Sequence, residues 1–158
     1  MHLITRLDFP ASPERVFAMV TDEEFLAHAA AELGSPTSRV AASATRTAVE
    51  GAIETPAPLR SFLGPQLNIT QETVWGEPDA LGARTGAVTL TVGGAPVSLT
   101  GTAVLSPAQG GSTLTYEADL VVRVPLLGPR LETMAAPLIT DAFEAQGRVG
   151  DAWLATHP

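Results

Sequence analysis

The sequence predicts an α+β fold in which a strongly curved, seven-stranded antiparallel sheet is accompanied by two short helices and closed by a long C-terminal helix. Three observations lead to this prediction: alternating apolar and polar residues near the start, a Thr- and Val-rich middle broken by turn residues, and an apolar stripe at helical spacing near the end. Since 158 residues is the size of one ordinary domain, we predict a single domain over residues 1–158.

The first strand and the two short helices occupy the first 34 residues. Residues 3–9 alternate between two faces, which is typical of a half-buried strand. Ser12 and Pro13 then suit the N-cap and the first position of a short helix. Thr21 and Glu24 have the spacing of a capping box, so we predict a second helix that starts there and ends before Gly34.

The middle of the chain predicts an antiparallel meander. It is rich in β-branched residues and in short turns, such as the glycine pairs at 93–94 and 110–111. The six strands that we expect here cover residues 37–46, 48–55, 67–76, 83–93, 96–106 and 112–124.

The last element is a helix over residues 129–155. Its apolar residues recur every three or four positions, so they form one stripe that can cover the sheet. At ~1.5 Å per residue, such a helix is roughly 40 Å long and crosses the whole sheet.

Composition excludes several kinds of chemistry. The chain has no cysteine, and all nine of its basic residues are Arg, so thiolate catalysis, disulfides and Lys-based catalysis are excluded. A net charge of −8 repels phosphate backbones and anionic lipid heads, so we expect no nucleic-acid partner. High Ala and Arg usage is similar to that of high-GC bacteria.

Targeting signals and metal ligands are not expected either. The N-terminus lacks the pattern of a signal peptide, and no apolar run is long enough to span a membrane, so a cytoplasmic location is the expectation. His2, His28 and His157 are far apart in sequence, whereas a metal site needs about three ligands in one place, so we predict no metal site and no cofactor.

Several motifs resemble those of the START-like (SRPBCC) superfamily. The segment 11–17 (ASPERVF) resembles that superfamily's entry into its first helix. The segments 72–75 (ETVW), 94–97 (GAPV), 124–128 (VPLLG) and 153–154 (WL) resemble one of its uncharacterised bacterial families, a domain of unknown function. The resemblance implies a helix-grip fold with a cavity between sheet and long helix, and it carries over no catalytic residue.

The residues on the inward face of the predicted sheet also favour a cavity. Many of them are Gly or Ala, which leaves either room for close approach of the helix or unfilled space, and we favour unfilled space. We expect the polar inward groups to orient a ligand. The candidate ligand-binding residues are Gln71, Thr73, Trp75, Leu99, Tyr116, Met134, Leu138 and Ala142.

Residues 55–66 are expected to form the mouth of this cavity. Three prolines exclude the segment from a central strand, yet it carries Leu59, Phe62 and Leu63 at helical spacing. These side chains need an apolar surface to cover, so we predict a stiff flap over the opening. The alternative is that Phe62 plugs the end of the core permanently.

The leading functional hypothesis is non-enzymatic binding or carriage of a hydrophobic small molecule, such as a lipid, a sterol-like or a polyketide-like compound. One alternative is a cyclase- or hydrolase-like enzyme that uses Tyr116, Gln71 or Arg46 as polar groups. Another alternative is a protein-interaction module with a filled core. The sequence predicts no oligomeric state.

Overall fold

The computed structural model describes residues 1–36 and 38–158, which form seven strands, four α-helices and one short 3-10 helix. The strands are β1 His2–Phe9, β2 Arg39–Ala42, β3 Arg46–Glu54, β4 Gln66–Trp75, β5 Arg84–Gly93, β6 Val97–Ala108 and β7 Gly111–Val122. The helices are α1 Pro13–Val20, α2 Glu23–Glu32, the 3-10 helix η1 Ala57–Leu59, α3 Arg60–Leu63 and α4 Gly128–Thr156.

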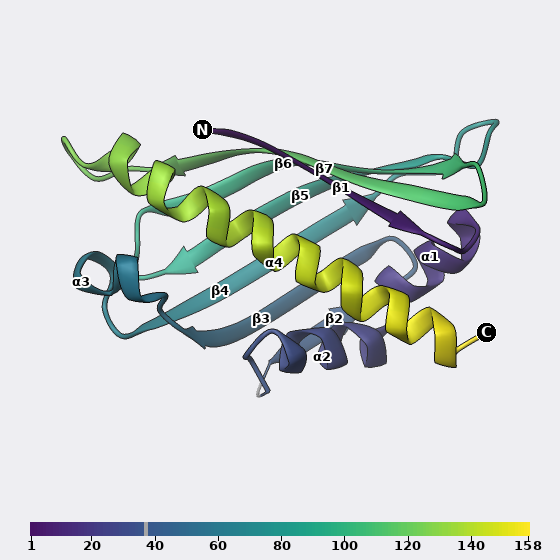
Figure 1. Ribbon diagram of the computed structural model, residues 1–158, viewed down its shortest axis with the longest axis horizontal. Helices are drawn as coiled ribbons and strands as arrows, with labels where there is room; N and C mark the ends of the chain where they lie inside the picture. The colour runs from purple at the N-terminus through teal and green to yellow at the C-terminus, as the bar shows by residue number, and fades with distance from the viewer. Residues whose placement is uncertain (37) are drawn as a thin grey trace.

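The strands form one antiparallel sheet in the order β1-β7-β6-β5-β4-β3-β2. This is the meander predicted from the turn pattern, with β1 added beside β7 at the edge. Helix α4 lies diagonally across one face of the sheet, with α1 and α2 near its C-terminal end and α3 on the side of its N-terminal half (Figure 1). The predicted α+β architecture with a long C-terminal helix is therefore confirmed.

Alternation decides which face of the sheet meets α4. Along β7, the side chains of Leu114, Tyr116, Ala118 and Leu120 are buried, and the residues between them are partly or fully exposed. The register continues this inner face from strand to strand, since Leu120 pairs with Leu99 in β6. The inner face is thus the one that the period of two predicts.

The start of α2 differs from the prediction. The N-cap is Asp22, whose Oδ1 accepts hydrogen bonds from the backbone N–H groups of Glu24 at 2.7 Å and Phe25 at 3.2 Å. The hydroxyl of Thr21 instead donates to the carbonyl of Phe17 at 2.7 Å, at the end of α1. The predicted Thr21–Glu24 capping box is therefore wrong, because the preceding helix already uses the Thr21 hydroxyl.

The boundary between β2 and β3 also differs. Residue 37, where we expected β2 to begin, lies outside the described residues. β2 ends at Ala42, and the Ser43 hydroxyl then accepts a hydrogen bond from the backbone N–H of Arg46 at 3.1 Å. The turn lies at 43–45, so Arg46 begins β3 and does not end the preceding strand.

The C-terminal half of α4 packs directly against β1. A Cβ atom at Gly147 would lie 2.9 Å from a methyl group of Leu7, and one at Gly150 would lie 2.8 Å from the ring of Phe9. Both glycines therefore allow close approach of the helix to the sheet. No helix in the described part of the chain is long and apolar enough to cross a membrane.

Candidate functional site: a two-lobed cavity beneath helix α4

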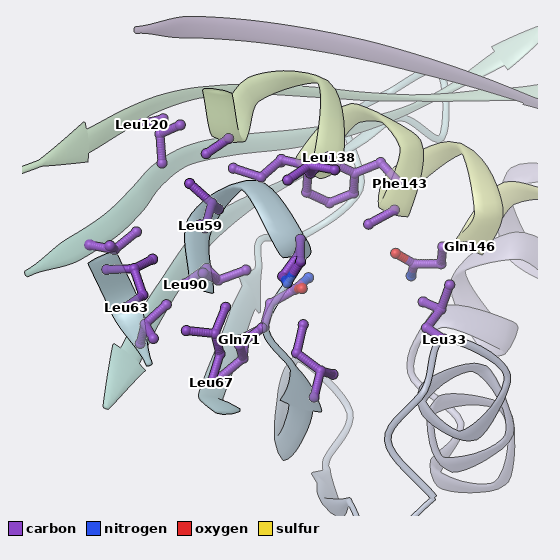
Figure 2. A pocket seen from close by; sticks show the side chains of 18 residues that line it. Leu33, Leu59, Leu63, Leu67, Gln71, Leu90, Leu120, Leu138, Phe143 and Gln146 are labelled. Carbon is purple, nitrogen blue, oxygen red and sulfur yellow. The ribbon is translucent and has the colours of Figure 1, made fainter. Parts of the chain in front are cut away.

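The N-terminal half of α4 lies over a cavity of about 210 Å³. The cavity is lined by α4, by the inner face of β3 to β7 and by the η1–α3 segment (Figure 2). Leu59 and Leu63 close it on the η1–α3 side, and Leu138 lies on the helix side. The wall residues are Leu33, Ile53, Pro56, Leu59, Leu63, Leu67, Ile69, Gln71, Leu90, Val92, Val97, Leu120, Ala135, Leu138, Ile139, Ala142, Phe143 and Gln146.

A second space of about 210 Å³ adjoins the first. It extends toward α2 and the inner face of β3, where Ser35, Ser38 and Gly51 line it. The residues that line both spaces are Leu33, Ile53, Ile69, Gln71, Leu90, Ala142 and Gln146. We treat the two spaces as the first and second lobes of one cavity.

The wall is apolar apart from a few neutral polar groups. In the first lobe these are Gln71 on β4 and Gln146 on α4, which approach the space from the sheet and from the helix (Figure 2). The second lobe adds Ser35 and Ser38. Among the described residues, no wall residue of either lobe carries an ionisable side chain.

Tyr116 lies behind this wall and supports it. Its ring stacks on Phe143 with centroids 4.4 Å apart, and only 6% of the residue is exposed. Burial raises the pKa of Tyr116 to about 12, and a hydrogen bond with Gln146 opposes part of that rise. The phenol therefore stays neutral at ordinary pH, and it holds the wall residues Phe143 and Gln146 in place.

Five of the predicted residues lie on the cavity wall. Gln71 comes from β4, and Leu138 and Ala142 come from α4. Leu59 and Leu63, predicted for the mouth, line the first lobe at its η1–α3 end. Leu59 is 5% exposed.

Thr73 and Trp75 do not line either lobe. Both are buried on the inner face, as alternation predicts, but they lie farther along β4 than Gln71. There Trp75 packs edge-on against Phe17 of α1 at 5.7 Å. Alternation identified the correct face of the sheet but could not locate the cavity along the strand.

Leu99, Tyr116 and Met134 are core residues and do not line the cavity. Leu99 is fully buried, and Tyr116 lies behind Phe143. Met134 packs partly buried against the core, and the next residue on the helix, Ala135, lines the wall. The space that we expected around these three residues is filled.

Phe62 faces outward. It is 42% exposed and is absent from the wall, whereas Leu59 and Leu63, one helical turn apart, both line it. Phe62 is therefore not the plug that the alternative hypothesis assumed. The sequence spacing of Phe62 grouped it with Leu59 and Leu63 on one apolar face. The helices η1 and α3 are short, however, and only the side that carries Leu59 and Leu63 faces the cavity.

Arg46 likewise turns away from the interior. Its Nη2 donates to Oε2 of Glu72 at 2.9 Å, and both side chains are largely exposed. The arginine that we considered as a polar group inside the cavity is thus part of a surface ion pair.

The predicted site residues leave out thirteen of the eighteen residues that line the first lobe, among them Leu33, Phe143 and Gln146. Gln146 is the most informative of these, since it lies one turn beyond Ala142 and so on the same side of α4. The helical spacing from Ala142 to Gln146 was the signal in the sequence that could have placed Gln146 on the cavity wall. A glutamine within an apolar stripe indicates a polar group that faces a cavity or a partner.

Comparison with known proteins supports the fold and the family. The uncharacterised protein Mb0491c of Mycobacterium bovis is 32% identical over 93 residues, which cover 58% of this chain and 53% of that protein. Rv0481c of Mycobacterium tuberculosis H37Rv matches to the same extent. The match thus spans about half the length of these relatives.

Solved structures share the fold at low identity. TTHA0849 of Thermus thermophilus superposes with a TM-score of 0.69 at 19% identity over all of both chains. Norcoclaurine synthase from Thalictrum flavum, crystallised with dopamine and hydroxybenzaldehyde, gives 0.65 at 13% identity, covering 100% of this chain and 88% of that one. A STAR-related lipid transfer protein of Xanthomonas axonopodis gives 0.64 at 15% identity, covering 98% and 84%.

These neighbours confirm the START-like fold that the motifs predicted. The family described as protein of unknown function (DUF2505) matches residues 5–154, nearly the whole chain. The chain therefore belongs to the DUF2505 family.

Proposed function

We propose that this protein binds and carries a hydrophobic small molecule in the two-lobed cavity, without transforming it. The observation that carries the proposal is the first lobe, a void of about 210 Å³ with a nearly continuous apolar wall. Protein interiors are normally packed to a density of ~0.75, so a void of this size is unusual.

The apolar wall of the first lobe supports an occupant. Each Å² of apolar surface that a ligand removes from water contributes about 25 cal/mol. An apolar cavity of about 150 Å³ is enough to bind benzene. The first lobe, at about 210 Å³, exceeds that volume.

The structural neighbours support the same conclusion. One is named for lipid transfer, and another was crystallised with two aromatic small molecules. Their identities to this chain are below 20%, so they support a small-molecule cavity in this fold and do not identify the ligand.

The two alternative functions receive less support from the cavity. An enzyme that uses general acid–base catalysis needs a group that gains and loses a proton near neutral pH. The described wall residues offer amides and hydroxyls, and Tyr116, with a pKa of about 12, lies behind them. An interaction module with a filled core does not account for the void.

The η1–α3 segment is our candidate for the entrance. Leu59 and Leu63 cover the first lobe, and Gly64, which follows them, has φ of 82°, a conformation that glycine adopts without strain. Elements that open for ligands come from the less stable segments of a fold. Hydrogen exchange tests this: the amides of residues 59–64 should exchange faster than those of β4 and slow down when ligand is added. Protection equal to that of β4 in both states would contradict the entrance.

The binding function itself is tested with a neutral apolar dye and two matched variants. Nile red should bind the purified protein, and Ala142→Phe should weaken that binding at least tenfold, because Ala142 lines both lobes. Ala152→Phe is the control, since Ala152 is exposed on the same helix away from both lobes. Native mass spectrometry of gently purified protein should also detect a co-purified small molecule. If Nile red does not bind, or if both variants bind it like the wild type, the proposal is refuted.

A further inference from the structure

We infer that the ligand is an uncharged amphiphile, with its apolar tail in the first lobe and a neutral hydrogen-bonding group near Gln71 and Gln146. This inference rests on the proposed binding function and adds the chemical class of the ligand. Its basis is the position and the type of every polar group on the described part of the wall.

Gln71 and Gln146 lie where the two lobes adjoin. Both residues line both lobes, one from the sheet and one from α4 (Figure 2). A side-chain amide offers two donor hydrogens and one acceptor oxygen. The pair can therefore bind a hydroxyl, a carbonyl or an amide of a ligand.

The second lobe continues this polar side of the cavity. Ser35 and Ser38 line it, whereas no serine lines the described wall of the first lobe. The polar end of the ligand thus points toward α2, and its tail points toward Leu59 and Leu63.

A charged group has no counter-ion in this cavity. Neither lobe has a cationic residue on its described wall. The neighbouring Arg60 on α3 donates to Glu54 at 3.1 Å and to the carbonyl of Thr55 at 3.2 Å, outside the wall. An ionised carboxylate would lose its water without gaining a counter-ion, so we expect a fatty acid to bind in its protonated form.

The need for protonation limits how strongly the protein can prefer an alcohol over a fatty acid, and it makes this preference depend on pH. With a carboxyl pKa of about 4.3, the need to take up a proton reduces the affinity up to about 1000-fold at pH 7.3 and about tenfold at pH 5.3. An alcohol of the same chain length has no such cost. The preference for the alcohol over the acid should therefore fall about tenfold for each pH unit on acidification.

The test is calorimetric titration of the wild-type protein with 1-decanol and decanoate at pH 7.3 and pH 5.3. We expect 1-decanol to bind at least 30-fold more tightly at pH 7.3 and the ratio to shrink to tenfold or less at pH 5.3. Equal affinities, tighter binding of decanoate or a ratio that does not change with pH would overturn the inference. So would Nile red binding with no binding of either decyl compound, whereas loss of Nile red binding would refute the proposed function itself.

Matched glutamine variants locate the polar contact. Gln71→Leu should weaken 1-decanol binding about fivefold, the effect of one neutral hydrogen bond. Gln109→Leu is the control, because Gln109 is exposed in the turn between β6 and β7. Gln71→Arg should bind decanoate more tightly than the wild type does. If Gln71→Leu binds 1-decanol as the wild type does, and Gln71→Arg gains nothing for decanoate, the polar contact is not at this position and the inference fails.

Discussion

Replacing Ala142 with leucine should stabilise the fold and weaken ligand binding at the same time. Ala142 lines both lobes, and its surface is accessible rather than packed. A leucine there adds three carbon atoms, each worth about 0.8 kcal/mol when removed from water. Ordering the new side chain costs about 0.5–1 kcal/mol, so the net gain is about 1.5 kcal/mol.

The assay is thermal unfolding of the ligand-free protein. For a domain of this size, 1 kcal/mol shifts the melting temperature by about 2–4 °C, so Ala142→Leu should raise it by about 3–6 °C. Binding of Nile red should weaken in the same variant, since the leucine occupies part of both lobes.

Two control substitutions make the same chemical change elsewhere. Ala103 is fully buried and packed, so Ala103→Leu should destabilise the fold by about 1–3 kcal/mol through overpacking. Ala152 is exposed, as Ala142 is, but it lines neither lobe, so Ala152→Leu should change little. If Ala142→Leu lowers the melting temperature as Ala103→Leu does, the space beneath α4 is already filled and the reasoning is refuted.

Three further predictions concern individual side chains. Asp22→Ala should destabilise the fold by about 1 kcal/mol in urea unfolding, because α2 loses its N-cap, whereas an unchanged midpoint would contradict that role. Tyr116 is the single tyrosine, so absorbance at alkaline pH reports on it alone: its ionisation should appear near pH 12, and the stability that its neutral form provides should decline as pH rises above its ordinary pKa of 10.0. Hydrogen bonds that the protonated His2 ring donates to the carboxylates of Asp119 and Glu117 raise the pKa of His2 above 6.5. Its contribution to stability is therefore complete below pH 6.5 and is lost as pH rises through the folded-state pKa. An NMR titration should place the His2 midpoint above 6.5 and show it falling in Asp119→Asn; a midpoint at 6.5 in both proteins would contradict the contacts.

Local patterns predicted the elements well because each depends on neighbours in the chain. The alternation in β4 put Gln71 on the inner face, and helical spacing put Leu138 and Ala142 on one side of α4. The same logic failed at Thr21, where two helix ends compete for one hydroxyl. Only the three-dimensional arrangement decides which of them forms the bond.

The small residues on the inner face show a second kind of ambiguity. A glycine or alanine in the sequence is compatible with close packing and with empty space. In the structure both occur on the same helix: Gly147 and Gly150 bring α4 onto Leu7 and Phe9, while Ala142 faces the cavity. The sequence could not show which of these small residues pack closely and which face empty space, because the distance between helix and sheet is set by side chains from distant strands.

Backbone periodicity was enough to predict the fold class, the inner face of each strand and the side toward which Gln71, Leu138 and Ala142 point, since it sets the direction of each side chain. The position of the cavity along α4 and the presence of both Gln71 and Gln146 on its wall emerged from the folded arrangement and from no local pattern. These two glutamines are 75 positions apart in the chain, and they line the same cavity only because α4 crosses β4 at that point. The helix also packs closely on Leu7 and Phe9 of β1 at Gly147 and Gly150, a contact between segments distant in the chain that no local pattern encodes.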